Sequence, residues 1–265
     1  MVWRAAVKLA YDGRCFHGFQ RQPDRRTVEG EVLRALGRIG AVRSATEARF
    51  KGASRTDRGV SALGNVVAFD TAFRRGELLR ALNAETDDVY YYGIADVPFS
   101  FSPRRARARW YRYFLRREGL DADLVGAAAA VFRGKHDFRA FCREDGRSTV
   151  RKIDSIDVSG VGDFLIIDVR ARDFLWNMVR RMVGAMTEVA LGRSEIGEVA
   201  EMLERGARSF GLAPAENLVL MDVVYDFDFE HACPPTLSGR LRSRREEAFL
   251  ALGFFDGLIG RCGLG

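Results

Sequence analysis

The order of the strands and helices predicted for the first hundred residues constrains the fold more than any other feature of the sequence. Apolar and polar residues alternate in four short segments, a pattern typical of strands. Two segments have apolar residues at helical spacing, and Thr27 can cap the first of them. The expected elements are strands over 2–11, 47–51, 66–69 and 89–95 and helices over 28–39 and 74–84. Their β-α-β-β-α-β order predicts a ferredoxin-like, split βαβ unit.

The second part of the chain repeats this order in part. Pro103 and the arginines after it mark a boundary, so we expect an N-terminal domain over 1–104 and a C-terminal domain over 105–265. The later strands are expected at 107–116, 150–158 and 163–171, with a final strand pair over roughly 217–229. The later helices are expected from about Asp121 and over 174–191 and 194–205. The sequence therefore predicts an α+β fold with two ferredoxin-like halves, whose antiparallel or mixed sheets meet at a central active-site cleft. A tail over about 231–265 is expected to dock on the body or on a partner subunit.

Composition limits the kinds of function. The net charge of +6 suits a polyanionic partner. Only four of the 42 basic residues are lysines, which either reflects a GC-rich genome or serves phosphate contacts and base stacking by arginine. The four cysteines form no CxxC pair and the three histidines are dispersed, so we expect no metal site and no disulfide framework. Without a signal peptide or an apolar run of about 18 residues, a cytoplasmic protein without membrane contact is expected.

A short run around Asp57 is the first candidate site. This carboxylate lies between Arg55 and Arg58, and nearby guanidinium groups favour the ionised form of a carboxyl group. Gly52 and Gly59 flank the run and allow turns or close approach of a ligand. Because strand-like segments precede and follow it, we expect Asp57 in a loop between two strands. A charge pair in a surface turn is the alternative interpretation.

Tyr111 lies in a basic and aromatic strand, Arg109 to Tyr113. In a strand, Tyr111 and Tyr113 face the side opposite to Trp110. An exposed tyrosine ring can stack on a base, and its hydroxyl group can transfer a proton. The alternative is that these aromatic residues pack in the core.

Arg180 interrupts the apolar helix expected to begin at residue 174. An unpaired buried charge is costly, so a buried arginine needs a partner, and we expect Asp57 to be that partner. Exposure of Arg180 and Arg181 to solvent is the alternative. His136 and Asp137 could form a dyad, but adjacent residues rarely face each other, which favours a structural loop.

Six motifs, in order over most of the chain, resemble those of the tRNA pseudouridine synthase A family. They lie at Tyr11–Val28, Ser54–Ala62, Tyr111–Tyr113, Gly134–Phe138, Phe174–Arg180 and Ala213–Leu220. The chain departs from the family pattern at Ser54, at Ser61 and at the pair Trp176-Asn177, where the family has glycine, histidine and two histidines. These departures, the arginine-rich composition and the tail are consistent with an archaeal-type member.

The resemblance implies the pseudouridine synthase fold and an isomerase that converts uridine to pseudouridine in the anticodon stem-loop of tRNA, at one or more of tRNA positions 38, 39 and 40. It implies that Asp57 is the catalytic aspartate, Tyr111 the active-site tyrosine and Arg180 the partner of Asp57. Family members act as homodimers on tRNA without a cofactor or a metal, and we expect the same here.

Contacts with RNA are also implied by the resemblance. Arg55 would help to displace the target base, which must leave its stack to be reached. Leu220, or alternatively Leu218, would pack on the uracil ring, and Arg58 and Gln20 would contact the RNA. The sequence leaves open whether Asp57 attacks as a nucleophile or abstracts a sugar proton.

Two other functions are consistent with the residues alone. One is a non-catalytic RNA-binding protein on the same scaffold. The other is an enzyme that uses Asp57 on a glycoside, but this chemistry usually needs a second carboxylate nearby, and no paired acid stands out in the sequence.

Overall fold

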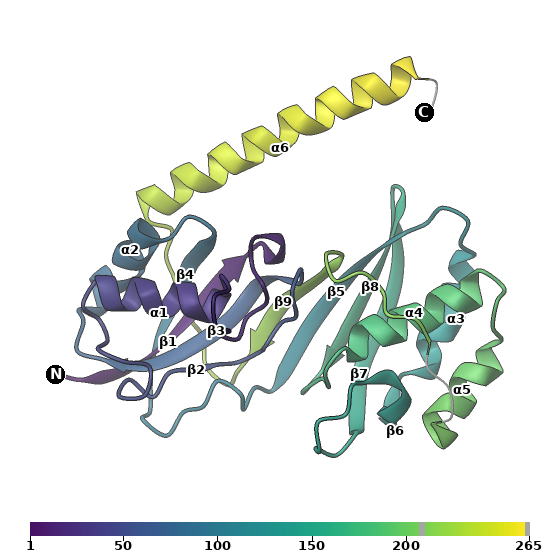
Figure 1. The fold of residues 1–265 in the computed structure, drawn as a ribbon, viewed down its shortest axis with the longest axis horizontal. Coiled ribbons are helices and arrows are strands. Elements are labelled where there is room, and N and C mark those ends of the chain that lie inside the picture. The colour runs from purple at the N-terminus through teal and green to yellow at the C-terminus, as the bar shows by residue number, and fades with distance from the viewer. Residues whose placement is uncertain (207–209, 263–265) are drawn as a thin grey trace.

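The chain folds into one mixed sheet with helices packed against it, in a computed structural model that describes residues 1–206 and 210–262 (Figure 1). The strands are β1 (Trp3–Tyr11), β2 (Lys51–Gly52), β3 (Ser61–Thr71), β4 (Val89–Val97), β5 (Ala108–Arg116), β6 (Gly134–Asp137), β7 (Val150–Val161), β8 (Phe164–Ala171), β9 (Leu218–Val224) and β10 (Glu230–His231). The helices are α1 (Val28–Arg38), α2 (Arg75–Glu85), α3 (Ala122–Val131), α4 (Met178–Ala190), α5 (Ile196–Arg205) and α6 (Pro235–Arg261). The predicted α+β class is confirmed.

The two predicted halves lie side by side in this sheet. The strand order is β10-β4-β1-β3-β9-β5-β8-β7-β6, and β2 pairs with β3. The first half has the predicted β-α-β-β-α-β order, from β1 to β4. Strand β9 comes from the end of the second half and lies between β3 and β5. It runs parallel to β3 over two residue pairs and antiparallel to β5, so it joins the halves. The boundary at residue 104 stays a prediction.

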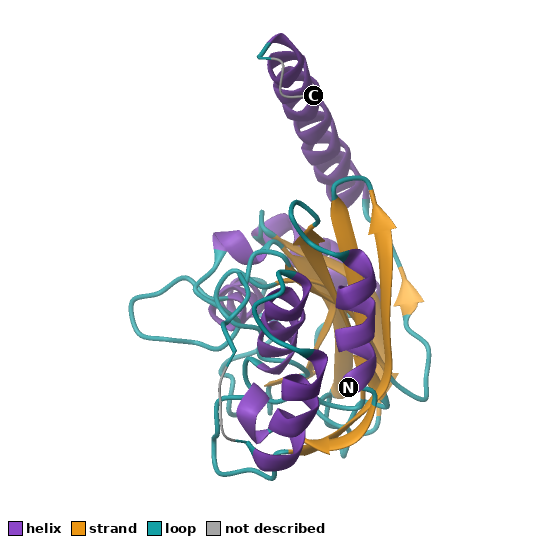
Figure 2. Cartoon of the chain, turned by 90° about the vertical axis from the view of Figure 1, so that its right-hand side faces the viewer, coloured by secondary structure: helices purple, strands orange, loops and turns teal. Residues whose placement is uncertain are grey.

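Helices α1 to α5 gather on one face of the sheet, as Figures 1 and 2 show together. The alternation predicted for β5 is present: Arg109, Tyr111 and Tyr113 are buried, whereas Trp110 and Arg112 are partly exposed. Because successive side chains of a strand point to opposite faces, the three buried residues share one face. This face of β5 carries the residues of the candidate site.

Three predicted elements are wrong in their extent. The strand pair expected over 217–229 is one strand, β9, and the next strand, β10, begins at Glu230. The strand expected over 47–51 is mostly turn, because Arg49 has a left-handed backbone conformation (φ 46°), and only Lys51 and Gly52 pair with β3. The helix expected to begin at Phe174 begins at Met178, because Asn177 is left-handed (φ 65°) and cannot continue a helix. Residues 174–177 therefore form a turn in front of α4.

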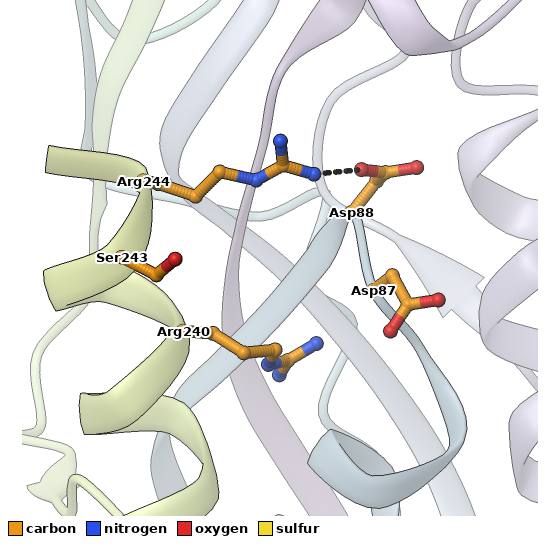
Figure 3. A pocket seen from close by; sticks show the side chains of 5 residues that line it. All are labelled: Asp87, Asp88, Arg240, Ser243 and Arg244. Atoms are coloured by element: carbon orange, nitrogen blue, oxygen red, sulfur yellow. Dashed lines mark ion pairs between the residues drawn. The ribbon is translucent and has the colours of Figure 1, made fainter. Parts of the chain in front are cut away.

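Helix α6 docks by its first part only. Arg240 donates hydrogen bonds to the Thr86 carbonyl and to Asn83 Oδ1, and Arg244 lies 3.7 Å from Asp88 (Figure 3). Beyond this contact the helix projects from the body (Figure 1), and Phe249 is 73% exposed. Residues 263–265 of the predicted tail lie outside the described residues. No helix in the described part is long and apolar enough to cross a membrane.

Candidate active site

The loop that carries Asp57 is fixed by buried hydrogen bonds. Asn65, which is fully buried on β3, accepts a hydrogen bond from the Ser54 amide (3.2 Å) and donates one to the Ser54 carbonyl (3.0 Å). The same Asn65 amide donates to the Tyr11 hydroxyl (3.0 Å), which lies 2.8 Å from Thr56 Oγ1. Buried polar groups that are fully paired hold a unique arrangement. The neighbours of Asp57 are therefore fixed in position.

Two glycines allow the loop to turn and pack. A Cβ atom on Gly13 would lie 2.3 Å from the Val60 carbonyl carbon, so this close approach requires glycine. Gly59 has a φ of +87°, which other residues rarely adopt. It allows the turn that is closed by the hydrogen bond from the Val60 amide to the Asp57 carbonyl (3.2 Å). The glycine expected to serve the turn after Asp57 does so.

The Asp57 carboxylate faces the start of α4. Its Oδ2 lies 3.7 Å from Nη1 of Arg180, and its side chain is 27% exposed. Burial raises the pKa of Asp57, whereas the charge of Arg180 and a hydrogen bond from Trp176 act to lower it. Arg180 is itself held by a 2.7 Å hydrogen bond from its Nε to the Ala213 carbonyl. The arginine that sequence analysis pairs with Asp57 thus lies beside it.

Tyr111 is more buried than a free stacking platform would be. Its ring meets Phe174 edge to face, with centroids 5.1 Å apart, and 9% of the residue is exposed. Burial raises the pKa of Tyr111 to about 12; the charge of Arg109 and a hydrogen bond with Ser54 act to lower it, and the charge of Asp57 acts to raise it. The phenol is therefore protonated at neutral pH.

Arg109 is a site residue that sequence analysis did not select. Its buried guanidinium donates to Ser54 Oγ (3.0 Å) and to the carbonyl groups of Ala53 (3.0 Å), Arg104 (3.1 Å) and Arg172 (2.5 Å). It thereby ties the Asp57 loop to β5 and to the segment after β8. Its position two residues before Tyr111 places both side chains on one face of β5, so the alternation of the strand could have identified it.

The predicted RNA contacts differ in exposure. Arg55, Arg58 and Gln20 are exposed. Burial lowers the pKa of Arg104, and the charge of the nearby Arg55 lowers this pKa further. In the described part of the chain, no acidic side chain forms an ion pair with Arg55 or Arg58, which leaves both free to bind an anion.

The two leucines predicted to pack on uracil lie in β9 beside β5. Leu220 is opposite Tyr111 in the register and is fully buried, and Leu218 is 5% exposed. In this structure Leu220 supports the Tyr111 strand from within the sheet. Direct contact of either leucine with a base stays a prediction.

The adjacent pair His136 and Asp137 has a structural environment. His136 Nε2 bonds to the Arg133 carbonyl (2.9 Å), and Asp137 accepts hydrogen bonds from Thr149 Oγ1 (2.5 Å) and the Arg139 amide (3.1 Å). The pair lies in a short strand, β6, and not in a loop. Among the described residues no group of three or more His, Cys, Asp or Glu side chains could hold a metal ion.

Comparison with known proteins identifies relatives over most of the chain. A family model described as tRNA pseudouridine synthase matches residues 128–226. A tRNA pseudouridine synthase A of Pyrococcus abyssi is 48% identical over 227 residues, which cover 84% of this chain and 85% of that protein. The protein of the same name from Thermococcus sibiricus is 47% identical, with the same coverage.

Solved structures give a weaker match. A Cbf5-Nop10-Gar1 complex contains a chain that aligns with a TM-score of 0.35 and 12% identity, over 69% of this chain and 54% of that one.

Proposed function

The chain belongs to the tRNA pseudouridine synthase family, and we propose that it is an isomerase that converts uridine to pseudouridine in tRNA. One observation carries the proposal: a half-buried carboxylate, Asp57, lies beside the guanidinium of Arg180, in a loop that Arg109 ties to the strand of Tyr111. Asp57, Arg180 and Tyr111 are the three side chains to which the resemblance assigns catalytic roles. They come from the β2–β3 loop, from α4 and from β5.

The reaction breaks the bond from N1 of uracil to C1′ of the ribose and forms a bond from C5 to C1′. The proton on C5 is lost and N1 gains one, so no oxidant, reductant or energy source is needed. Asp57 would either attack C1′ or take a proton from the sugar. Either route uses the ionised carboxylate, which the charge of Arg180 favours against the effect of burial.

Tyr111 would transfer the protons that the reaction moves on the uracil ring. Since its pKa of about 12 keeps the phenol protonated at neutral pH, it starts as a hydrogen-bond donor. We propose that it gives this proton to N1 and then accepts the proton that leaves C5. Its position beside Phe174 holds the ring in place for a displaced uracil.

The anticodon stem-loop is the proposed substrate region, as the resemblance implies. Arg55, with its exposed and unpaired guanidinium, is proposed to fill the place of the displaced base, and Arg58 to contact a phosphate group. The cytoplasm is the proposed compartment.

A homodimer is also proposed, and the exposed apolar side chains of α6, such as Phe249, support contact with another molecule. Light scattering of the full chain at micromolar concentration, against a variant that ends at Arg245, tests this contact.

Tritium release from tRNA labelled at C5 of uridine tests the reaction. We expect release by the unaltered chain, none by Asp57→Asn, and normal release by Asp96→Asn, whose carboxylate is exposed and forms no ion pair in the described structure. If neither the unaltered chain nor Asp57→Asn releases tritium while both bind tRNA equally, the protein is a non-catalytic RNA-binding protein. Activity of Asp57→Asn would remove Asp57 from the mechanism.

A further inference from the structure

Trp176 is the most exposed tryptophan of the chain and lies next to the catalytic carboxylate. It is 42% exposed, in the turn between β8 and α4. Its indole group lies close enough to Asp57 to act on that carboxyl and lower its pKa. The other two tryptophans are partly buried and use their indole N–H groups within the fold: Trp3 donates to the Phe73 carbonyl (2.9 Å) and Trp110 to Asp168 (2.6 Å). An exposed indole beside a reactive group requires an explanation beyond packing.

Arg143 completes the feature. Its guanidinium carbon lies 4.1 Å from the centroid of the Trp176 ring, and its backbone amide donates to the Trp176 carbonyl (2.9 Å). In the described residues no acidic side chain forms an ion pair with Arg143. The guanidinium therefore keeps its hydrogen-bonding capacity for an outside anion while it stacks on the indole.

We propose that Trp176 and Arg143 form a stacking site for an unpaired RNA base that neighbours the target uridine. The inference rests on the proposed function and deepens it. An aromatic ring offers stacking to any base, and an adjacent arginine offers a charge to the phosphate of the same nucleotide. Trp176 lies four residues before Arg180, whose guanidinium is 3.7 Å from Asp57, so a base stacked on the indole is next to the nucleotide that enters the active site.

The position of the site follows from the backbone. Asn177, in its left-handed conformation, ends the turn and starts α4, so Phe174 and Trp176 both precede the helix that carries Arg180. Phe174 packs against the Tyr111 ring, whereas the Trp176 ring carries Arg143 and is exposed. One turn therefore contacts the tyrosine of the active site and presents a second ring outside it.

Binding measurements can separate stacking from catalysis. In the Asp57→Asn background, which is expected to bind without turnover, we expect Trp176→Ala to raise the Kd for an anticodon stem-loop RNA by roughly 5- to 100-fold. Trp176→Phe keeps a ring and is expected to stay within about threefold of the parent. Trp110→Phe is the matched control, because Trp110 also carries an arginine on its ring (Arg170, 4.6 Å) but lies on the opposite face of β5.

A fluorescent base gives a second readout. With 2-aminopurine next to the target uridine, we expect quenching on binding that is lost in Trp176→Ala and kept in Trp110→Phe. Unchanged affinity and quenching in Trp176→Ala, or equal losses in Trp110→Phe, would overturn the inference. Tritium release by the otherwise unaltered chain is measured in parallel. If Trp176→Ala loses binding while the unaltered chain releases no tritium, the stacking site is kept and the proposed reaction is rejected.

Discussion

Asp57 Oδ2 lies 3.7 Å from Nη1 of Arg180, and the pKa of this carboxyl is nevertheless above its usual value of 3.8. Burial withdraws water from the carboxylate, and Arg180 compensates for only part of this loss. The folded protein therefore binds the Asp57 proton more tightly than the unfolded chain does. Stability then falls as pH rises from the unfolded to the folded pKa, and the destabilisation is complete above the folded pKa. At neutral pH the charge of Asp57 weakens the fold.

Asp57→Asn is expected to raise the melting temperature at pH 7 while it lowers activity by roughly 10⁴-fold or more. The amide removes the buried charge, so the gain in stability should shrink as pH falls below the folded pKa of Asp57. Calorimetry between acid and neutral pH measures the difference in melting temperature between Asp57→Asn and the unaltered protein, with Asp96→Asn, at an exposed residue, as the control. A lower melting temperature for Asp57→Asn at pH 7 would show that Arg180 stabilises the carboxylate more than burial destabilises it.

Arg180→Gln is expected to move the acid limb of the pH–rate profile to higher pH. The charge of Arg180 lowers the pKa of Asp57, and without it a larger share of the carboxyl is protonated at a given pH. Activity at pH 7 should fall by roughly 10²- to 10³-fold. Arg180→Lys keeps the charge, so its profile should lie closer to that of the unaltered protein. Single-turnover rates from pH 4 to 9 give the comparison, and superimposable acid limbs would contradict it.

Tyr111→Phe is expected to bind tRNA normally and to release tritium roughly 10²- to 10⁴-fold more slowly. The ring still packs against Phe174, but the hydroxyl that would exchange protons with uracil is gone. Tyr113→Phe is the control, because Tyr113 lies on the same face of β5 and is 1% exposed. Equal rates for the two variants would mean that the Tyr111 hydroxyl has no part in proton transfer.

Binding of tRNA is expected to weaken steeply with salt, because phosphate contacts release counterions. Arg55→Ala and Arg58→Ala should each reduce the slope of log Kd against log salt concentration by about 1. Arg116→Ala, whose side chain pairs with Glu118 (3.1 Å), should leave the slope unchanged. Titrations at several salt concentrations measure these slopes, and a slope near zero for the unaltered chain would remove RNA phosphate from the model of binding.

Gly59→Ala is expected to destabilise the protein by about 1–3 kcal/mol. Its φ of +87° disfavours any side chain, and a Cβ atom there would lie 3.0 Å from Glu216 Oε1. Gly126→Ala is the matched control, since Gly126 is inside α3 with no atom within 4 Å of the added carbon. That change should stabilise the helix by roughly 0.8–1 kcal/mol. Urea unfolding distinguishes the two, and similar shifts for both would show that the turn after Asp57 tolerates a side chain.

Much of the fold could be predicted because periodicity and caps report local structure. Thr27 caps α1 with its side chain as expected, accepting from Gly30 N (3.3 Å), and the alternation of β5 gives the correct inner face. The errors at Arg49 and Asn177 share one cause. Both residues adopt a left-handed backbone, which apolar periodicity does not reveal. The joining of two halves into one sheet also depends on long-range pairing that no local pattern contains.

The site could be predicted in part for a different reason. A rule about buried charge led from Arg180 to Asp57, and these residues do lie together. Arg109 was missed because its guanidinium donates hydrogen bonds to the Ser54 hydroxyl and to carbonyl groups, and not to a carboxylate. A search for charge pairs therefore cannot identify it. The burial of Tyr111 agrees with the alternative interpretation, in which the aromatic residues of this strand pack in the core. The sequence could not show its partner, the Phe174 ring, which packs against it from the turn before α4.

The position of β9 between β3 and β5 determines when the site can form during protein synthesis. Asp57 follows β2 and Tyr111 lies in β5, so both leave the ribosome long before residues 218–224. Until β9 emerges, β3 and β5 have no strand between them to join, and the sheet stays in two pieces. We therefore expect the Asp57 loop and the Tyr111 strand to reach their final positions in one sheet only late in translation. We expect the complete candidate site to form only when the last fifth of the chain is made. RNA binding that depends on this site would begin at the same point.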